Sequence, residues 1–245
     1  MFFVSCSTIS ITSHTYSKPV EDLNLIFDEI SECANGVYSG ISGVYSTTDK
    51  MMSEALMDAA KNVLIHNKAA LKTQTYGEDS DNSFLLLFDD HIQYSDVQLL
   101  SVINKLEIIS IKFSDSLGCV VLTKYADSTD DFPPFNLKRN EDNVPLWIKG
   151  NYEVPGYIIG IGRTMHYSNV WSSIEAADYL SVDSIFAQVR DIDGFVIHNQ
   201  ILNNGAYRDQ SYQGNINSIS GAKIIARYYD KKNDIYYSFA LLKEE

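Results

Sequence analysis

The stretch Gly156-Tyr157-Ile158-Ile159-Gly160-Ile161-Gly162-Arg163 decides the fold, because an earlier stretch resembles it. The earlier stretch is Gly36-Val37-Tyr38-Ser39-Gly40-Ile41-Ser42-Gly43. Each pattern predicts a strand that leads into a helix with an acidic-Ala pair, Glu54-Ala55 in the first helix and Glu175-Ala176 in the second. The offset is about 120 residues, which indicates two copies of one small unit.

Two β-rich runs follow each helix at a distance. They cover residues 106–113 and 119–125 in the first copy, and residues 222–229 and 235–242 in the second. The expected fold class is therefore α+β, with two tandem small domains, each a helix packed on a curved, mainly antiparallel sheet in the order strand–helix–strand–strand. The expected domains are residues 21–127 and 145–245. Residues 128–144, which are rich in Pro and polar side chains, form the linker between them.

Apolar residues at helical spacing mark the buried face of each long helix. The first set is Met52, Leu56, Ala59, Ala60, Val63 and Leu64, and the second is Ile174, Ala177, Leu180, Ser181, Ser184 and Ile185. Shorter patterns predict a helix over 97–106 after Ser95-Asp96 and a strand over 84–88. Residues 22–33 fit either a short helix or the approach to the first strand.

Composition excludes some classes of protein. The apolar fraction is 45%, which is normal for a globular protein, and no segment approaches the ~20 apolar residues of a membrane span. The net charge of −13 argues against a nucleic-acid partner, which would need a basic face. Residues 1–131 carry 8 Lys/Arg and 19 Asp/Glu, or −11, and the remainder carries −2. The acidic half is either a solvated surface or a docking surface for a basic partner or for cations.

The three cysteines do not indicate a zinc or redox site, because no two of them have CxxC spacing. Cys119 lies in an apolar run and is expected to be a small buried residue, with a nucleophile as the alternative. Whether Cys33 and Cys119 pair is left open.

The first six residues, Met1-Phe2-Phe3-Val4-Ser5-Cys6, look like the end of a bacterial lipoprotein signal peptide. The apolar run is followed by a small residue and then by Cys6, which would be the lipid-attachment site. Residues 7–20 would be a flexible tether, so residues 1–20 are interpreted as a signal-peptide remnant and tether. Too few residues precede Cys6 for a complete signal peptide, and no basic segment is present.

No catalytic motif is complete. Gly160-x-Gly162 lacks the third glycine of GxGxxG, since Met165 stands there, so the glycines are expected to let the helix cross close over the strand. No two of the five histidines have metal-ligand spacing: His14, His66, His91, His166 and His198. The acidic turn 77–82 lacks the ligand order of an EF-hand. We expect no enzyme activity, no cofactor and no metal.

Four tyrosines stand on the last two strands: Tyr228, Tyr229, Tyr236 and Tyr237. Cross-strand packing is the first interpretation of these rings, and a stacking surface for a ligand or partner is the second. Residues 203–220, rich in Asn, Gly and Ser, are expected to form a long mobile loop.

Several segments of the second half together resemble a known family. They are Pro145-Leu146-Trp147-Ile148, residues 157–162, Glu175-Ala176, residues 221–229 and residues 236–242. The chain is similar there to the LPP-twenty-type bacterial lipoprotein family, whose related domains occur in flagellar-ring proteins of the FlgT type. The first copy, without the Pro-x-Trp opening, matches more loosely. The resemblance implies a compact α+β unit in an envelope lipoprotein, usually at the outer membrane, with no catalytic residues to carry over.

The leading functional hypothesis is a non-enzymatic bacterial cell-envelope lipoprotein that acts as a structural or protein-interaction module. It would face the periplasm, be acylated (palmitate) at Cys6 after signal-peptide cleavage, and bind other envelope proteins. The alternatives are a small-ligand-binding module, with the tyrosine hairpin and the 203–220 loop as its site, and a cytosolic assembly protein whose N-terminus is genuine. Exposed strand edges could also support oligomers.

Overall fold

The computed structural model describes residues 22–30, 35–67, 69–71, 95–128, 132, 138–149, 152–167, 169–192 and 217–244. The helices are α1 (Leu23–Ile30), α2 (Thr48–Asn67), α3 (Asp96–Ile103), the 3-10 helix η1 (Leu146–Lys149) and α4 (Val170–Ile192). The strands are β1 (Val37–Ile41), β2 (Ala69–Leu71), β3 (Leu106–Ser114), β4 (Gly118–Tyr125), β5 (Tyr157–Met165), β6 (Asn217–Ile219), β7 (Lys223–Asp230) and β8 (Ile235–Lys243).

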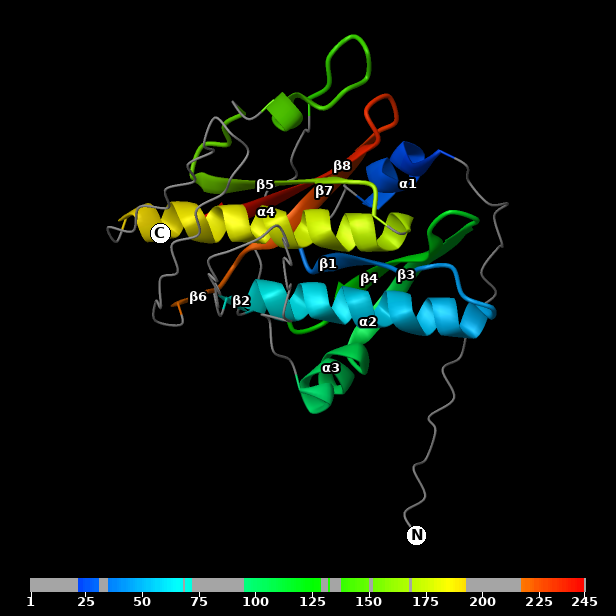
Figure 1. Ribbon diagram of the computed structural model, residues 1–245. Coiled ribbons are helices and arrows are strands. Elements are labelled where there is room, and N and C mark those ends of the chain that lie inside the picture. The colour runs from blue at the N-terminus through cyan, green and yellow to red at the C-terminus, as the bar shows by residue number, and fades with distance from the viewer. Residues whose placement is uncertain are drawn as a thin grey trace, which may run out of the picture.

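Two three-stranded antiparallel sheets carry the fold. The first unit, β1-α2-β3-β4, has strand order β1-β4-β3, and the second unit, β5-α4-β7-β8, has the equivalent order β5-β8-β7. Helix α2 packs on the first sheet and α4 on the second, and the two helices run in the same direction (Figure 1). The expected α+β class, with helices packed on antiparallel sheets, is confirmed.

Glycines place each long helix unusually close to its strand. A Cβ on Gly40 would lie 1.9 Å from the carbonyl oxygen of Ala55, and one on Gly162 would lie 1.8 Å from that of Ala177. The two contacts are equivalent, at an offset of 162 − 40 = 177 − 55 = 122 residues. The Glu-Ala pairs of the sequence pattern differ by 121 residues, so they are not equivalent in the structure.

The equivalent strands β3 and β7 each contain a β-bulge. The register of β3 with β4 shifts between Ile108 and Ser110, and that of β7 with β8 shifts between Ile224 and Ala226. The offset is 224 − 108 = 226 − 110 = 116 residues. Since a bulge sets the twist and bend of a strand, its recurrence supports a true structural repeat.

Most predicted elements are present, with shifted ends. Residues 22–33 contain a helix, α1, and the helix expected over 97–106 ends at Ile103. Of the predicted core of α2, Ala59, Ala60 and Val63 are buried, whereas Met52, Leu56 and Leu64 are half-buried. The strand predicted over 84–88, the acidic turn 77–82 and residues 203–216 of the long loop lie outside the described residues. The end of the predicted loop is wrong, because residues 217–219 form β6, which pairs with β2.

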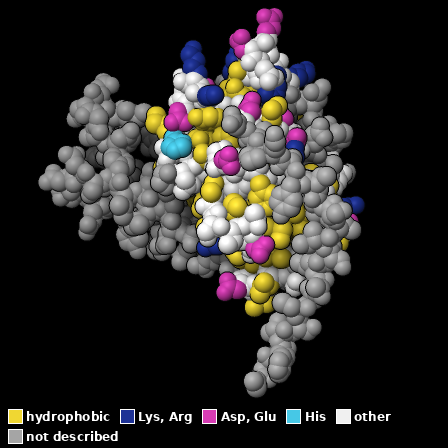
Figure 2. Space-filling view, turned by 90° about the vertical axis from the view of Figure 1, so that its right-hand side faces the viewer, with side chains coloured by type: hydrophobic (Ala, Val, Ile, Leu, Met, Phe, Trp, Pro, Cys, Tyr) yellow, Lys and Arg dark blue, Asp and Glu magenta, His cyan; other side chains and the backbone are white. Residues whose placement is uncertain are grey.

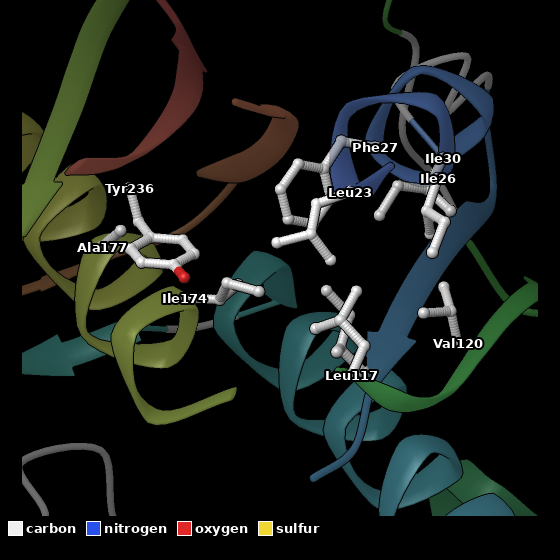
Figure 3. Packing of buried hydrophobic residues seen from close by; sticks show 10 residues of the cluster. Leu23, Ile26, Phe27, Ile30, Leu117, Val120, Ile174, Ala177 and Tyr236 are labelled. Atoms are coloured by element: carbon white, nitrogen blue, oxygen red, sulfur yellow. The ribbon is translucent and has the colours of Figure 1, made fainter. Parts of the chain in front are cut away.

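The two units share one hydrophobic core. Side chains of α1 point toward both the first sheet and the second unit (Figure 3). The cluster contains Leu23, Ile26, Phe27 and Ile30 of α1, Ile41, Leu117 and Val120 of the first unit, and Ile174, Ala177 and Tyr236 of the second. Within the expected linker, Phe132 is buried against Trp147 and the second sheet.

Candidate functional site at the junction of the two units

Arg227 of β7 is the central polar residue of the junction. It is 3% exposed, and its guanidinium donates to both carboxylate oxygens of Asp178 on α4 at 2.7–3.0 Å. It also donates to Ser39 Oγ of β1 at 2.8 Å. A buried charge needs such partners, because an unpaired one is costly. Arg227 therefore joins the second unit to the first.

Asp58 of α2 stands beside this ion pair and accepts a hydrogen bond from the Ile41 backbone N–H at 2.8 Å. Burial raises the pKa of Asp58 to about 7, against the lowering effects of the Ile41 N–H, Arg227 and Lys61. The nearby Asp178 carboxylate adds to the increase. Asp58 is thus a carboxyl group at the junction that changes charge near neutral pH.

Side chains cover the strand edges that meet at the junction. Trp171 Nε1 donates to the Ile41 carbonyl at 3.1 Å, and Asn62 Nδ2 donates to the Ser39 carbonyl at 2.9 Å. The Asn24 side chain bonds both the N–H and the carbonyl of Tyr229, at 2.8 and 2.9 Å. These bonds replace the strand partner that an edge lacks, so β1 and β7 meet through side chains.

An aromatic corner lies at the β7–β8 hairpin. The Tyr229 and Tyr236 rings stack with centroids 4.5 Å apart, and His166 Nδ1 lies 3.3 Å from the Tyr236 hydroxyl. Tyr229 donates to Asp234 at 2.9 Å. Burial, followed by the bond to Asp234, raises the pKa of Tyr229, and burial raises that of Tyr236. Tyr228 and Tyr237 also face each other across the strands, so the cross-strand packing interpretation is confirmed.

Exposed apolar side chains surround this end of the shared core. We define the junction face as Leu25, Val44, Met165 and Tyr167, whose exposures are 56%, 58%, 74% and 46%. Both units contribute, and the face lies at the end where α2 and α4 begin. Figure 2 views that end and shows hydrophobic side chains among side chains of both charges. Exposed apolar side chains from neighbouring elements at one end of a protein are typical of binding surfaces.

Contacts of neighbouring residues join the elements that carry these four side chains. A Cβ on Gly43, next to Val44, would lie 3.8 Å from Trp171 Cβ. The Tyr167 N–H donates to Ser173 Oγ in the first turn of α4, at 2.9 Å. Leu25 follows Asn24, which is bonded to Tyr229 and so joins α1 to the aromatic corner.

The structure places the candidate residues from the sequence as follows. Cys119 is fully buried, and burial raises the pKa of its thiol to about 12, which fits the small buried residue and opposes a nucleophile. Gly160 and Gly162 lie against the α4 backbone, which leaves no room for a phosphate on that side of the strand. Cys6, Cys33, His14, His91 and His198 lie outside the described residues. His66 is buried, and His166 belongs to the aromatic corner.

Sequence reasoning missed Asp58, Asp178 and Arg227. The available signal was a charged residue, Arg227, in the mainly apolar run 222–229, which also contains Lys223. Across the described ranges, no three His, Cys, Asp or Glu side chains form a group able to hold a metal ion. None of the described helices combines the length and apolar character needed to cross a bilayer.

Comparisons with known proteins give no relative. No family model, no curated protein and no solved structure matches this chain.

Proposed function

We propose that this protein is a non-enzymatic interaction module of the bacterial cell envelope, attached to the outer membrane by acylation of Cys6. The junction face carries the proposal, because exposed apolar side chains from both units gather on one end of a shared core. Burying exposed apolar side chains of this kind against another protein is more favourable than leaving them in water. The partner is an envelope protein with an apolar contact surface.

Photo-crosslinking tests the binding surface in the organism that carries the gene. A photoreactive amino acid at position 44 or 167 is expected to capture one defined envelope protein. The matched control is position 97, because Val97 is also apolar and 76% exposed but lies on α3. Equal capture from all three positions, or capture from none, would contradict a specific junction-face partner.

Intact mass tests the anchor. Expression in a bacterial host from the native gene, with about 100 bases upstream, is expected to yield a chain cleaved before Cys6 that carries acyl groups. Labelled palmitate should enter the wild type and not a Cys6→Ala variant. An unmodified chain beginning at Met1 would favour the cytosolic assembly protein instead.

A small-ligand-binding module is the second candidate. The observation that favours it is the stacked Tyr229–Tyr236 pair with His166, which is partly exposed, at its edge. A ligand that binds there should raise the melting temperature of the wild type by mass action, and less in His166→Ala. A metabolite panel that shifts neither protein would count against this candidate.

A further inference from the structure

The two units pack head to tail. The β7 and α4 side of the second unit meets the β1 edge and α2 of the first, through Arg227, Asp178 and Ser39. The two contact surfaces differ, so this is a heterologous interface between similar units. The outer counterparts of those surfaces are the β3 side of the first unit and the β5 edge of the second, since β3 and β5 are edge strands.

The repeat identifies which outer residues correspond to the junction network. The offset is 122 residues between β1 and β5 and between α2 and α4, and it is 116 residues between β3 and β7. On the first unit, Arg227 and Asp178 correspond to 227 − 116 = 111 and 178 − 122 = 56. On the second, Asp58 and Ser39 correspond to 58 + 122 = 180 and 39 + 122 = 161. All four positions are aliphatic: Leu56, Ile111, Ile161 and Leu180.

The contacts within each unit support this correspondence of positions. Leu56 and Ile111 belong to one hydrophobic cluster, just as Asp178 and Arg227 bond each other. All four aliphatic side chains are half-buried, so each still exposes part of its surface. The outer surfaces therefore present aliphatic groups where the junction has a polar network, and association would bury them.

The charges at the outer surfaces are complementary. At the junction Trp171 donates to the backbone carbonyl of Ile41, and these two positions correspond to 171 − 122 = 49 and 41 + 122 = 163. These positions hold Asp49 on the first unit and Arg163 on the second, both exposed. An acidic and a basic side chain so placed would attract each other across a head-to-tail contact.

We propose that copies of this chain associate head to tail, with the β5 edge of one copy against the α2 and β3 side of the next. The contact reproduces the packing between the two units inside each chain. This inference rests on the proposed interaction module, because it names one partner as a second copy, but it uses surfaces other than the junction face.

Sedimentation of the full chain over a concentration series tests the proposal. The wild type is expected to show a rising average mass with concentration. Asp49→Lys and Arg163→Glu should each weaken association at least tenfold, because each places like charges at the contact. Both residues are exposed, so folding should be unaffected. Glu141→Lys, at another exposed position, is the matched control and should associate like the wild type.

Mixing the two weakened variants tests whether positions 49 and 163 meet across the contact, and growth of the average mass beyond that of a dimer distinguishes head-to-tail packing from a symmetric dimer. The mixture restores opposite charges at every contact, so association should recover to near the wild-type level, as it should in the double variant. A wild type that stays monomeric to several hundred micromolar overturns the proposal, as does a mixture without recovery. Either result leaves the junction-face crosslinks and the Cys6 acylation, and hence the proposed function, standing.

Discussion

At the scale of single residues, the junction depends on a buried ion pair that the first unit does without. Arg227→Ile leaves the Asp178 carboxylate buried without its partner, and we expect a loss of about 3–5 kcal/mol in the free energy of unfolding. Adding Asp178→Leu recreates the Leu56–Ile111 pair of the first unit and should recover most of the loss. Urea unfolding measures both changes.

The control for this prediction is the partly exposed Lys61–Glu175 pair, where Lys61→Ala should cost less than about 1 kcal/mol. If the double variant is no more stable than Arg227→Ile alone, the network has a role that an apolar pair cannot take over.

Asp58 should make stability depend on pH. Its folded pKa of about 7 lies above the ordinary aspartic acid value of 3.8, so the folded state holds the proton more tightly than the unfolded chain. The free energy of unfolding should therefore fall as pH rises from about 4 to 7, by an amount on the order of 3 kcal/mol, and change little above that range through this group. Asp58→Asn keeps an acceptor for the Ile41 N–H and should abolish this dependence.

Urea midpoints at pH 5, 6, 7 and 8 measure the effect. Asp49→Asn, a change to an exposed carboxylate, serves as the control. A constant difference between wild type and Asp58→Asn from pH 5 to pH 8 would show that the Asp58 carboxyl does not titrate in this range.

At the scale of elements, the close approach of the long helix to its strand determines how helix and sheet pack in each unit. Gly162→Ala places a Cβ 1.8 Å from the Ala177 carbonyl, and backbone cannot move aside cheaply. We expect a loss of at least about 3 kcal/mol, and a similar loss for Gly40→Ala. Gly43→Ala is the matched control, since its nearest neighbour would be 3.8 Å away. Similar melting temperatures for all three variants would refute the packing argument.

The elements themselves could be predicted from the sequence, whereas the junction could not. Helical spacing along 48–67 and 170–192 and the β-rich runs are local signals, and each lies within one element. The junction network joins residues 58, 178 and 227, which belong to three elements. Periodicity describes one element at a time, so it cannot show which charged side chains meet. The one-residue error in pairing the Glu-Ala motifs has the same origin, because only the glycine contacts align the two helices.

At the scale of the whole molecule, the two units should unfold together. The cluster formed by α1, Ile41, Ile174 and Tyr236 is removed from water only when both units are folded. Separating them would expose this surface and leave Arg227 without Ser39. Because unfolding of either unit would lose that burial, the stabilities of the two units are coupled. We therefore expect one cooperative transition with no populated half-folded state.

Two built-in reporters can measure the coupling. Trp147 is buried in the second unit, Trp171 follows the junction because it bonds to Ile41, and Cys119 is buried in the first unit. In a Cys6→Ser, Cys33→Ser background, pulse labelling of Cys119 across a urea series should give the same midpoint as tryptophan fluorescence. Separate midpoints would mean that the shared core contributes less than either unit's own packing. In that case the chain would behave as two tandem domains, and the Arg227 network would join units that already fold alone.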